Sequence, residues 1–149
     1  MGKRHKAREL ATQILFHMEY SPGEVRDIFD LICANFESPK SNREFSKNLV
    51  YGVCENKKYL DKMIRRASKN WRVERMSRVD RSILRLSAYE LMFMDEIPPK
   101  VTIDEAVELA KKFGTEESSA FINGILDNIF NNMKTENLDS GTASDETDS

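Results

Sequence analysis

Apolar residues recur at intervals of three and four along almost the whole chain, and this periodicity limits the fold more than any other feature. That spacing follows one face of an α-helix, whereas a half-buried strand would alternate with a period of two. Such alternation is absent, and only six glycines and four prolines interrupt the 149 residues. The sequence therefore predicts an all-α fold.

About seven helices are expected. Residues 78–94 are apolar on most sides, so this helix should be central, with Arg78, Arg81 and Arg85 as its exposed strip. Glu90 lies among core positions of the same helix, and its carboxylate therefore needs a cationic or hydrogen-bonding partner. The other helices are expected over residues 3–19 and 24–36, from Ser41, after Asn56, from Thr102, and over 116–133.

Length and composition divide the chain into a domain and a tail. Residues 1–134 suit one compact domain with a single core. Residues 135–149 contain almost nothing apolar and are expected to form a disordered acidic tail. The tail holds five of the 25 acidic residues and none of the 23 basic ones, so the formal net charge of −2 conceals a mildly basic domain.

Several classes of protein are disfavoured by what the sequence lacks. No apolar run approaches the roughly 20 residues of a membrane span, and no secretory signal is visible, so a cytoplasmic protein is expected. Cys33 and Cys54 form no CxxC pair and are interpreted as reduced packing thiols, while His5 and His17 lack partners at metal-ligand spacing. No phosphate-loop, dinucleotide, zinc-protease or serine-hydrolase motif is present. The chain is therefore predicted to have no metal, no cofactor and no enzymatic activity.

A cationic cluster occupies the first turns of the first expected helix. Lys3, Arg4, Lys6 and Arg8 run directly into the amphipathic segment, and Arg4 and Arg8 are one turn apart. Cations at a helix N-terminus oppose the helix dipole, which suggests a purpose other than stability. A row of phosphate contacts is the favoured interpretation, and a solvated charged start is the alternative.

Aromatic residues supply weaker candidates. Phe16 should project opposite the buried stripe of its helix, as either a neutral surface residue or an anchor for a protein partner. Basic residues between Lys57 and Arg85 are interleaved with Tyr59 and Trp71, a composition that suits RNA, although Trp71 is preferred as a core plug. Near Gly114, Phe113 and Phe121 are expected at the core or its rim rather than as stacking platforms.

Three blocks of sequence occur in a fixed order: RHKARE (4–9), VDRSILRLSAYEL (79–91), and IPPKVTIDEA (97–106) continuing to FINGILD (121–127). Together these blocks resemble the NusB family of bacterial transcription antitermination factors. The resemblance covers about residues 3 to 130 and implies two small helical bundles without enzymatic activity. It also implies binding to the boxA element of ribosomal RNA leader transcripts together with NusE, a small-subunit ribosomal protein, within an antitermination complex on RNA polymerase.

The resemblance also assigns residues to two surfaces. One surface would bind RNA and the other would bind NusE. The RNA-binding residues would be Lys3, Arg4, His5, Lys6 and Arg8, with a second area at Phe113, Glu117 and Phe121. The partner-binding residues would be Phe16 and Asp80.

Two other functions compete with RNA binding. The domain could be a purely protein-binding or self-associating module, and a homodimer would then bury the surface assigned to NusE. The same fold could also be the targeting domain of an RNA methyltransferase, but the sequence stops after the expected helical domain, so a methyl-donor site is not expected.

Overall fold

A computed structural model describes residues 2–21, 23–34, 40–69 and 71–140. This part of the chain contains seven α-helices and one short 3-10 helix, η1, joined by turns, and it contains no strand. The predicted all-α class is therefore confirmed. The helices are α1 (Gly2–Tyr20), α2 (Val25–Ala34), α3 (Lys40–Glu55), α4 (Lys57–Ala67), η1 (Val73–Arg75), α5 (Arg78–Phe93), α6 (Pro99–Phe113) and α7 (Ser118–Ser140).

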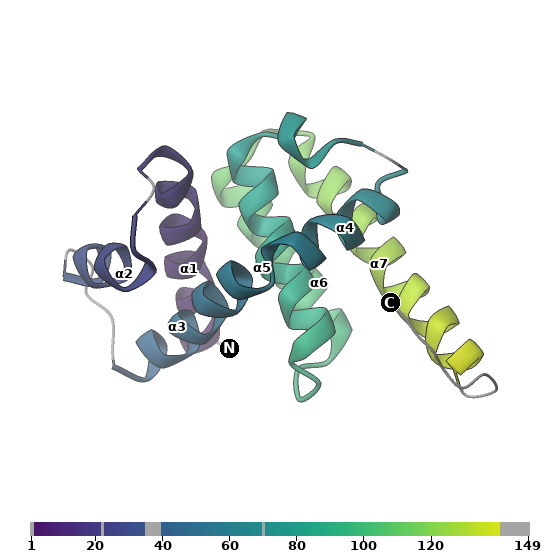
Figure 1. The fold of residues 1–149 in the computed structure, drawn as a ribbon, viewed down its shortest axis with the longest axis horizontal. Helices are drawn as coiled ribbons and strands as arrows, with labels where there is room; N and C mark the ends of the chain where they lie inside the picture. The colour runs from purple at the N-terminus through teal and green to yellow at the C-terminus, as the bar shows by residue number, and fades with distance from the viewer. Residues whose placement is uncertain (1, 22, 35–39, 70, 141–149) are drawn as a thin grey trace.

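The helices form two groups that share α5. Figure 1 shows α1, α2 and α3 on one side of the molecule and α4 to α7 on the other. Helix α5 packs against α1 and α3 of the first group and against α4, α6 and α7 of the second. The two small bundles expected from the resemblance are therefore present, and α5 is the element common to both.

The central position of α5 follows from its composition. Ten of its residues are buried, and the observed helix ends one residue before the predicted end. Its first turn is capped by Ser77, whose Oγ accepts a hydrogen bond from the backbone N–H of Asp80 at 3.0 Å. A helix buried on most sides can contact five neighbours, which explains how one element joins both bundles.

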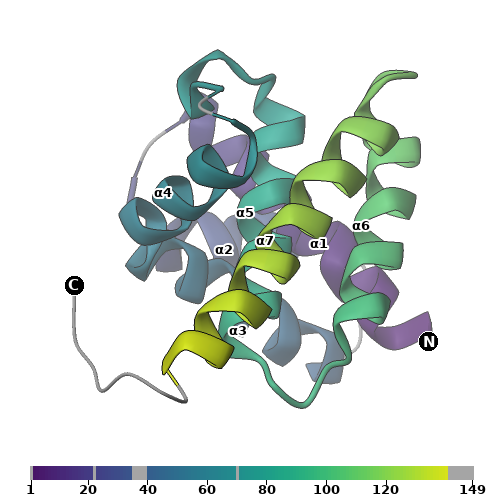
Figure 2. The same ribbon diagram turned by 90° about the vertical axis from the view of Figure 1, so that its right-hand side faces the viewer.

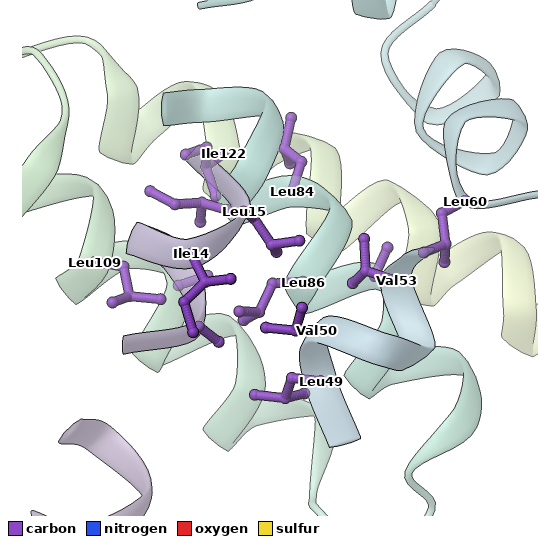
Figure 3. Close-up of a cluster of buried hydrophobic side chains, with 14 of the residues drawn as sticks. Ile14, Leu15, Leu49, Val50, Val53, Leu60, Leu84, Leu86, Leu109 and Ile122 are labelled. Atoms are coloured by element: carbon purple, nitrogen blue, oxygen red, sulfur yellow. The ribbon is translucent and has the colours of Figure 1, made fainter. Parts of the chain in front are cut away.

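One continuous apolar core runs through both bundles. Figure 3 shows side chains from α1, α3, α4, α5, α6 and α7 meeting in this core. Leu86 of α5 is fully buried, as are Ile14 of α1 and Leu109 of α6. Burying a side chain of this size contributes roughly 1.5–3 kcal/mol, so these contacts fix how the helices are arranged.

Two predicted helix boundaries are wrong. Helix α6 begins at Pro99 rather than Thr102, because proline suits the first helical position and the Thr102 hydroxyl is used elsewhere, in a bond to Glu90. Helix α7 continues to Ser140 rather than ending near Met133, and Glu136 pairs with Arg66 at 3.2 Å. The rest of the expected tail, 141–149, lies outside the described residues. None of the described helices is long and apolar enough to span a membrane.

Candidate RNA and partner interfaces

The first turns of α1 present cations to solvent, although not all those predicted. Arg4 and Lys6 are exposed, and Lys6 forms no ion pair within the described residues. Lys3 lies in α1, but its side chain is outside the described part. The guanidinium of Arg4 lies 4.8 Å from the centroid of the Phe45 ring on α3, a cation–π distance. This contact holds Arg4 against the protein while leaving it accessible.

Arg8 is placed differently from Arg4, and its predicted role as an exposed phosphate contact is wrong. Only 3% of Arg8 is exposed, and its Nε and Nη2 donate to the two carboxylate oxygens of Glu90 at 2.7 and 2.9 Å. Thr102 donates a further hydrogen bond to Glu90 at 3.0 Å. The sequence indicated that buried Glu90 needs a cationic or hydrogen-bonding partner, and Arg8 and Thr102 are those partners.

His5 faces carboxylates rather than open solvent. Its Nδ1 lies 2.7 Å from an Oε of Glu105 on α6, and its Nε2 lies 3.0 Å from an Oε of Glu9. Both ring nitrogens are therefore occupied by acidic partners. Glu9 in turn accepts a bond from Lys112 at 3.1 Å, which links the start of α1 to the end of α6. His5 belongs to this linkage, and a phosphate contact would have to displace a carboxylate.

The second predicted RNA area lies at the corner between α6 and α7. Phe113 and Phe121 are half-buried, as expected for rim residues, and Glu117 is exposed. Phe121 meets Trp71 edge to face, with 5.7 Å between ring centroids. The preferred interpretation of Trp71 as a core plug is wrong, because the residue is 55% exposed and covers only the outer side of Phe121.

An aromatic surface lies at the other end of α1. Phe16 is half-buried rather than exposed as predicted, because Tyr20 packs against it with ring centroids 5.0 Å apart. Tyr20 is 58% exposed, and the guanidinium of Arg78 lies 4.2 Å from its ring centroid. The sequence pattern did not single out Tyr20, although Phe16 and Tyr20 are spaced i, i+4, and it predicted Arg78 as exposed without linking it to Tyr20.

Asp80 stands two residues after Arg78 in the first turn of α5. Its Oδ1 atom is buried and has no hydrogen-bond partner among the described residues. A buried carboxylate oxygen without a donor carries a free-energy cost in the folded protein. Phe16, Tyr20, Arg78 and Asp80 are called the aromatic surface below.

Behind the aromatic surface, the predicted exposed strip of α5 is largely buried. Arg78 is exposed, but Arg81 and Arg85 are each only 9% exposed, so the prediction is wrong for these two. Arg81 donates to both oxygens of Glu19 at 2.7 and 2.8 Å, and Arg85 bonds Asp61 at 2.7 and 2.9 Å. The physical reason is that both guanidiniums satisfy carboxylates from neighbouring helices.

The charge of Glu19 is stabilised by this network. Burial alone would raise the pKa of Glu19, but the hydrogen bond from Arg81 and the positive charges of Arg81 and Arg85 outweigh it. The pKa of Glu19 is therefore lowered. Conversely, the hydrogen bond to Glu19 raises the pKa of Arg81.

The described residues contain no group of three His, Cys, Asp or Glu side chains that could hold a metal ion. Cys33 and Cys54 are both free, and burial raises the pKa of each thiol. Neither cysteine is therefore an activated nucleophile. The features that stand out are surfaces for binding: a cationic helix start, an aromatic corner and the aromatic surface.

This arrangement defines an all-α protein that presents two distinct surfaces from one helix, and comparison with known proteins gives its family. The NusB family model matches residues 5–131. A transcription antitermination protein NusB from Geobacter sulfurreducens is 51% identical over 130 residues, covering 87% of this chain and 94% of the relative. The chain belongs to the NusB family, whose members are transcription antitermination proteins rather than enzymes.

Solved structures agree with this assignment. A NusB from T. maritima superposes with a TM-score of 0.79 at 37% identity, covering 89% of this chain and 96% of that one. A second match is a chain from the crystal structure of antitermination factors NusB and NusE in complex with double-stranded RNA. It has a TM-score of 0.79 at 25% identity and covers 89% of this chain and 98% of that one.

Proposed function

We propose that the protein is a cytoplasmic transcription antitermination factor that binds the boxA RNA of ribosomal RNA leader transcripts together with NusE. Acting within a complex on RNA polymerase, the pair would suppress termination. The observation that carries the proposal is the 51% identity to a transcription antitermination protein NusB over most of both chains. The structure of NusB and NusE with RNA supports the choice of ligands.

The start of α1 is the proposed phosphate-binding surface. Arg4 and Lys6 are exposed on an element that is already ordered, so little chain entropy is lost on binding. Lys3 and His5 belong to the same turns. Arg8 acts indirectly, because its bond to Glu90 holds α1 in place beneath the exposed cations.

The corner at Phe113, Glu117 and Phe121 is the proposed second contact area for RNA. Phe121 and its neighbour Trp71 offer partly exposed rings on which bases can stack. Glu117 is exposed and carries the charge that repels phosphate, so its contribution would be a hydrogen bond to a base or ribose rather than to the backbone.

The aromatic surface is the proposed docking site for NusE. Phe16 and Tyr20 provide apolar anchors, and Asp80 provides a carboxylate in the first turn of α5. A homodimer that uses the same surface is the alternative occupant. Sedimentation of the protein with and without NusE separates the two, because NusE should displace a self-association built on this surface.

A boxA titration with and without NusE tests the proposal. Native protein should bind boxA RNA more tightly when NusE is present. The double variant Arg4→Ala, Lys6→Ala should weaken binding about tenfold and reduce the salt slope by up to roughly 1.4, since each single-strand phosphate contact contributes about 0.7.

The control for charge removal is Arg26→Ala, Lys134→Ala, which deletes two exposed cations from α2 and α7. This control should bind boxA RNA almost as tightly as the native chain. Equal losses of boxA affinity in the two double variants would show that the start of α1 is not the phosphate-binding surface. Absence of boxA binding by the native chain with NusE present would reject the proposed function itself.

A further inference from the structure

Helix α4 carries more positive charge than its packing uses. Its 11 residues include five basic side chains and a single acidic one, Asp61. Asp61 is already bonded to Arg85 of α5 at 2.7 and 2.9 Å, so it does not neutralise the outer face of α4. The basic residues of α4 are Lys57, Lys58, Lys62, Arg65 and Arg66.

Three of these cations form a row along the outside of the helix. Lys58, Lys62 and Arg65 are spaced by four and three residues, which places them on one face, opposite the buried Leu60 and Ile64. All three are exposed and have no ion-pair partner in the described part of the chain. Like charges one turn apart destabilise a helix slightly, so folding gives no reason for this row.

Exposed aromatic rings lie at both ends of the row. Tyr59 is 45% exposed and meets Phe93 of α5, itself 46% exposed, with 6.1 Å between ring centroids. Trp71 follows the other end of α4 and is 55% exposed. Cations that track a backbone, with exposed rings on which bases stack, are the combination that binds single-stranded nucleic acid without strong sequence preference.

The chain that follows the end of α4 leads through Lys69 and Trp71 to the proposed RNA surface at the α6–α7 corner. Trp71 touches Phe121, and an open hollow of about 520 Å³ beside this pair is lined by Lys69, Trp71, Phe121 and Asn128, among others. The start of α1 lies elsewhere: Figure 2 places it and α4 on opposite sides of the molecule, with α5 and α7 between them. A strand bound at α1 could reach α4 only by passing around the protein.

We propose that α4 is a second contact for single-stranded RNA, which holds the transcript flanking boxA through Lys58, Lys62 and Arg65 and stacks a base on Tyr59. This inference rests on the proposed function for the identity of the ligand. A charge row of one sign favours a polyanion, and its connection through Trp71 to Phe121 favours RNA over a protein partner. The contact would add affinity for RNA without sequence specificity, since contacts to phosphates position the strand but do not distinguish one base from another.

The test compares RNAs of different length, all in the presence of NusE. One RNA is boxA alone, and two others carry roughly ten uridines on the 5′ or the 3′ side, a length within the site sizes of such surfaces. The variant is Lys58→Ala, Lys62→Ala, Arg65→Ala. The matched control is Arg26→Ala, Lys100→Ala, Lys134→Ala, which removes three exposed cations from three other helices.

The native chain should bind one of the extended RNAs more tightly than boxA alone. The α4 variant should lose about tenfold in affinity for that RNA and about 2 in salt slope, while binding boxA alone within about twofold of native. The control should follow the native chain on every RNA. Alanine is the best helix former, so both triple variants should keep the native circular dichroism spectrum.

Substitutions of Tyr59 test the stacking part of the proposal. Tyr59→Ala should weaken binding of the extended RNA several-fold, since a stacked base contributes roughly 1–3 kcal/mol. Tyr59→Phe should bind like the native chain, because the ring remains. Equal losses in the two variants would show that the hydroxyl matters rather than the ring, and would overturn the stacking assignment.

Other outcomes overturn the inference while leaving the proposed function intact. Extended RNAs that bind no better than boxA alone would do so, and so would equal losses in the α4 variant and its control. Loss of NusE binding in the α4 variant would assign the row to a protein partner. If the native chain fails to bind boxA at all, its binding to a uridine oligonucleotide is measured instead. Binding that is lost in the α4 variant would support the inference, and absence of binding by the native chain would reject it.

Discussion

The two ends of α1 are fixed to α5 by ion pairs of opposite polarity. Near the start of α1, the helix supplies the cation: Arg8 reaches Glu90 of α5. Near its end, α1 supplies the anion, Glu19, to Arg81 and Arg85 of α5. The two helices therefore run antiparallel with a fixed register, because each end accepts only the opposite charge.

The difference between the ends lies in what each pair leaves exposed. At the start, burial of Arg8 leaves Arg4 and Lys6 as the outward cations. At the end, withdrawal of Glu19 into the network leaves Tyr20 and Arg78 exposed, with Phe16 half-buried against Tyr20. Charged residues one turn apart can thus have separate tasks, one holding the helix and one meeting a ligand.

The largest expected effect comes from breaking the pair at the start of α1. Arg8→Ala leaves Glu90 buried and without its cation, which should lower the free energy of unfolding by about 3–5 kcal/mol. Urea denaturation measures this change. Arg4→Ala, one turn away, should change stability by less than about 0.5 kcal/mol. Similar losses in both variants would contradict the division between a holding and a binding arginine.

A substitution at the other end should affect the partner rather than the fold. Phe16→Asp places a charge within the aromatic surface and should weaken NusE binding by about 2–4 kcal/mol, as loss of an interface anchor does. Calorimetric titration with NusE measures the loss, and helical circular dichroism should remain. Val101→Asp, an equivalent change at an exposed apolar residue of α6, is the control. Unchanged affinity for Phe16→Asp would remove the aromatic surface from partner binding.

A smaller effect is expected from the anion at the end of α1. Glu19→Gln should lower the free energy of unfolding by about 1–2 kcal/mol near neutral pH, because it weakens charge-assisted hydrogen bonds. The effect is smaller than that of Arg8→Ala because the site of Glu19 is partly solvated. Because the pKa of Glu19 is lowered in the folded state, its stabilisation is present above the ordinary carboxyl pKa of 4.5 and is lost as pH falls through the lower pKa of the folded protein. The gap between native and variant proteins in urea midpoint should therefore narrow in acid.

Glu44→Gln, at an exposed carboxylate of α3, is the control for this pH series and should track the native chain. A gap between native and Glu19→Gln proteins that stays constant from pH 7 to pH 3 would show that the Glu19 charge does not hold the end of α1. Only the start of α1 would then be held to α5 by an ion pair.

The fold was more predictable than the sites. The central helix was predicted within one residue, because its apolar positions cover most of its circumference and fit only a buried position. The need of Glu90 for a partner was also predictable, since a carboxylate among core positions is costly. The identity of the partner was not, because Arg8 is 82 residues away along the chain.

Arginine and tryptophan were the residues for which sequence patterns misled. Arg8, Arg81 and Arg85 were expected outside but are buried, and Trp71 was expected inside but is exposed. The arginine side chain is long, with an apolar stem and a charged tip. In this protein the guanidinium is buried where a carboxylate of another helix accepts its hydrogen bonds, as for Arg8, Arg81 and Arg85. A helical wheel gives the direction of a side chain but not what lies across from it.

Sequence by itself determined that this chain is helical, which helix is central and which family it belongs to, because periodicity and ordered motifs are local properties. Only the tertiary structure decided which cations of α1, α4 and α5 are neutralised in the interior and which remain for a ligand. The physical reason is that a buried charge needs a counter-charge, and the partner is supplied by packing between residues far apart in the chain.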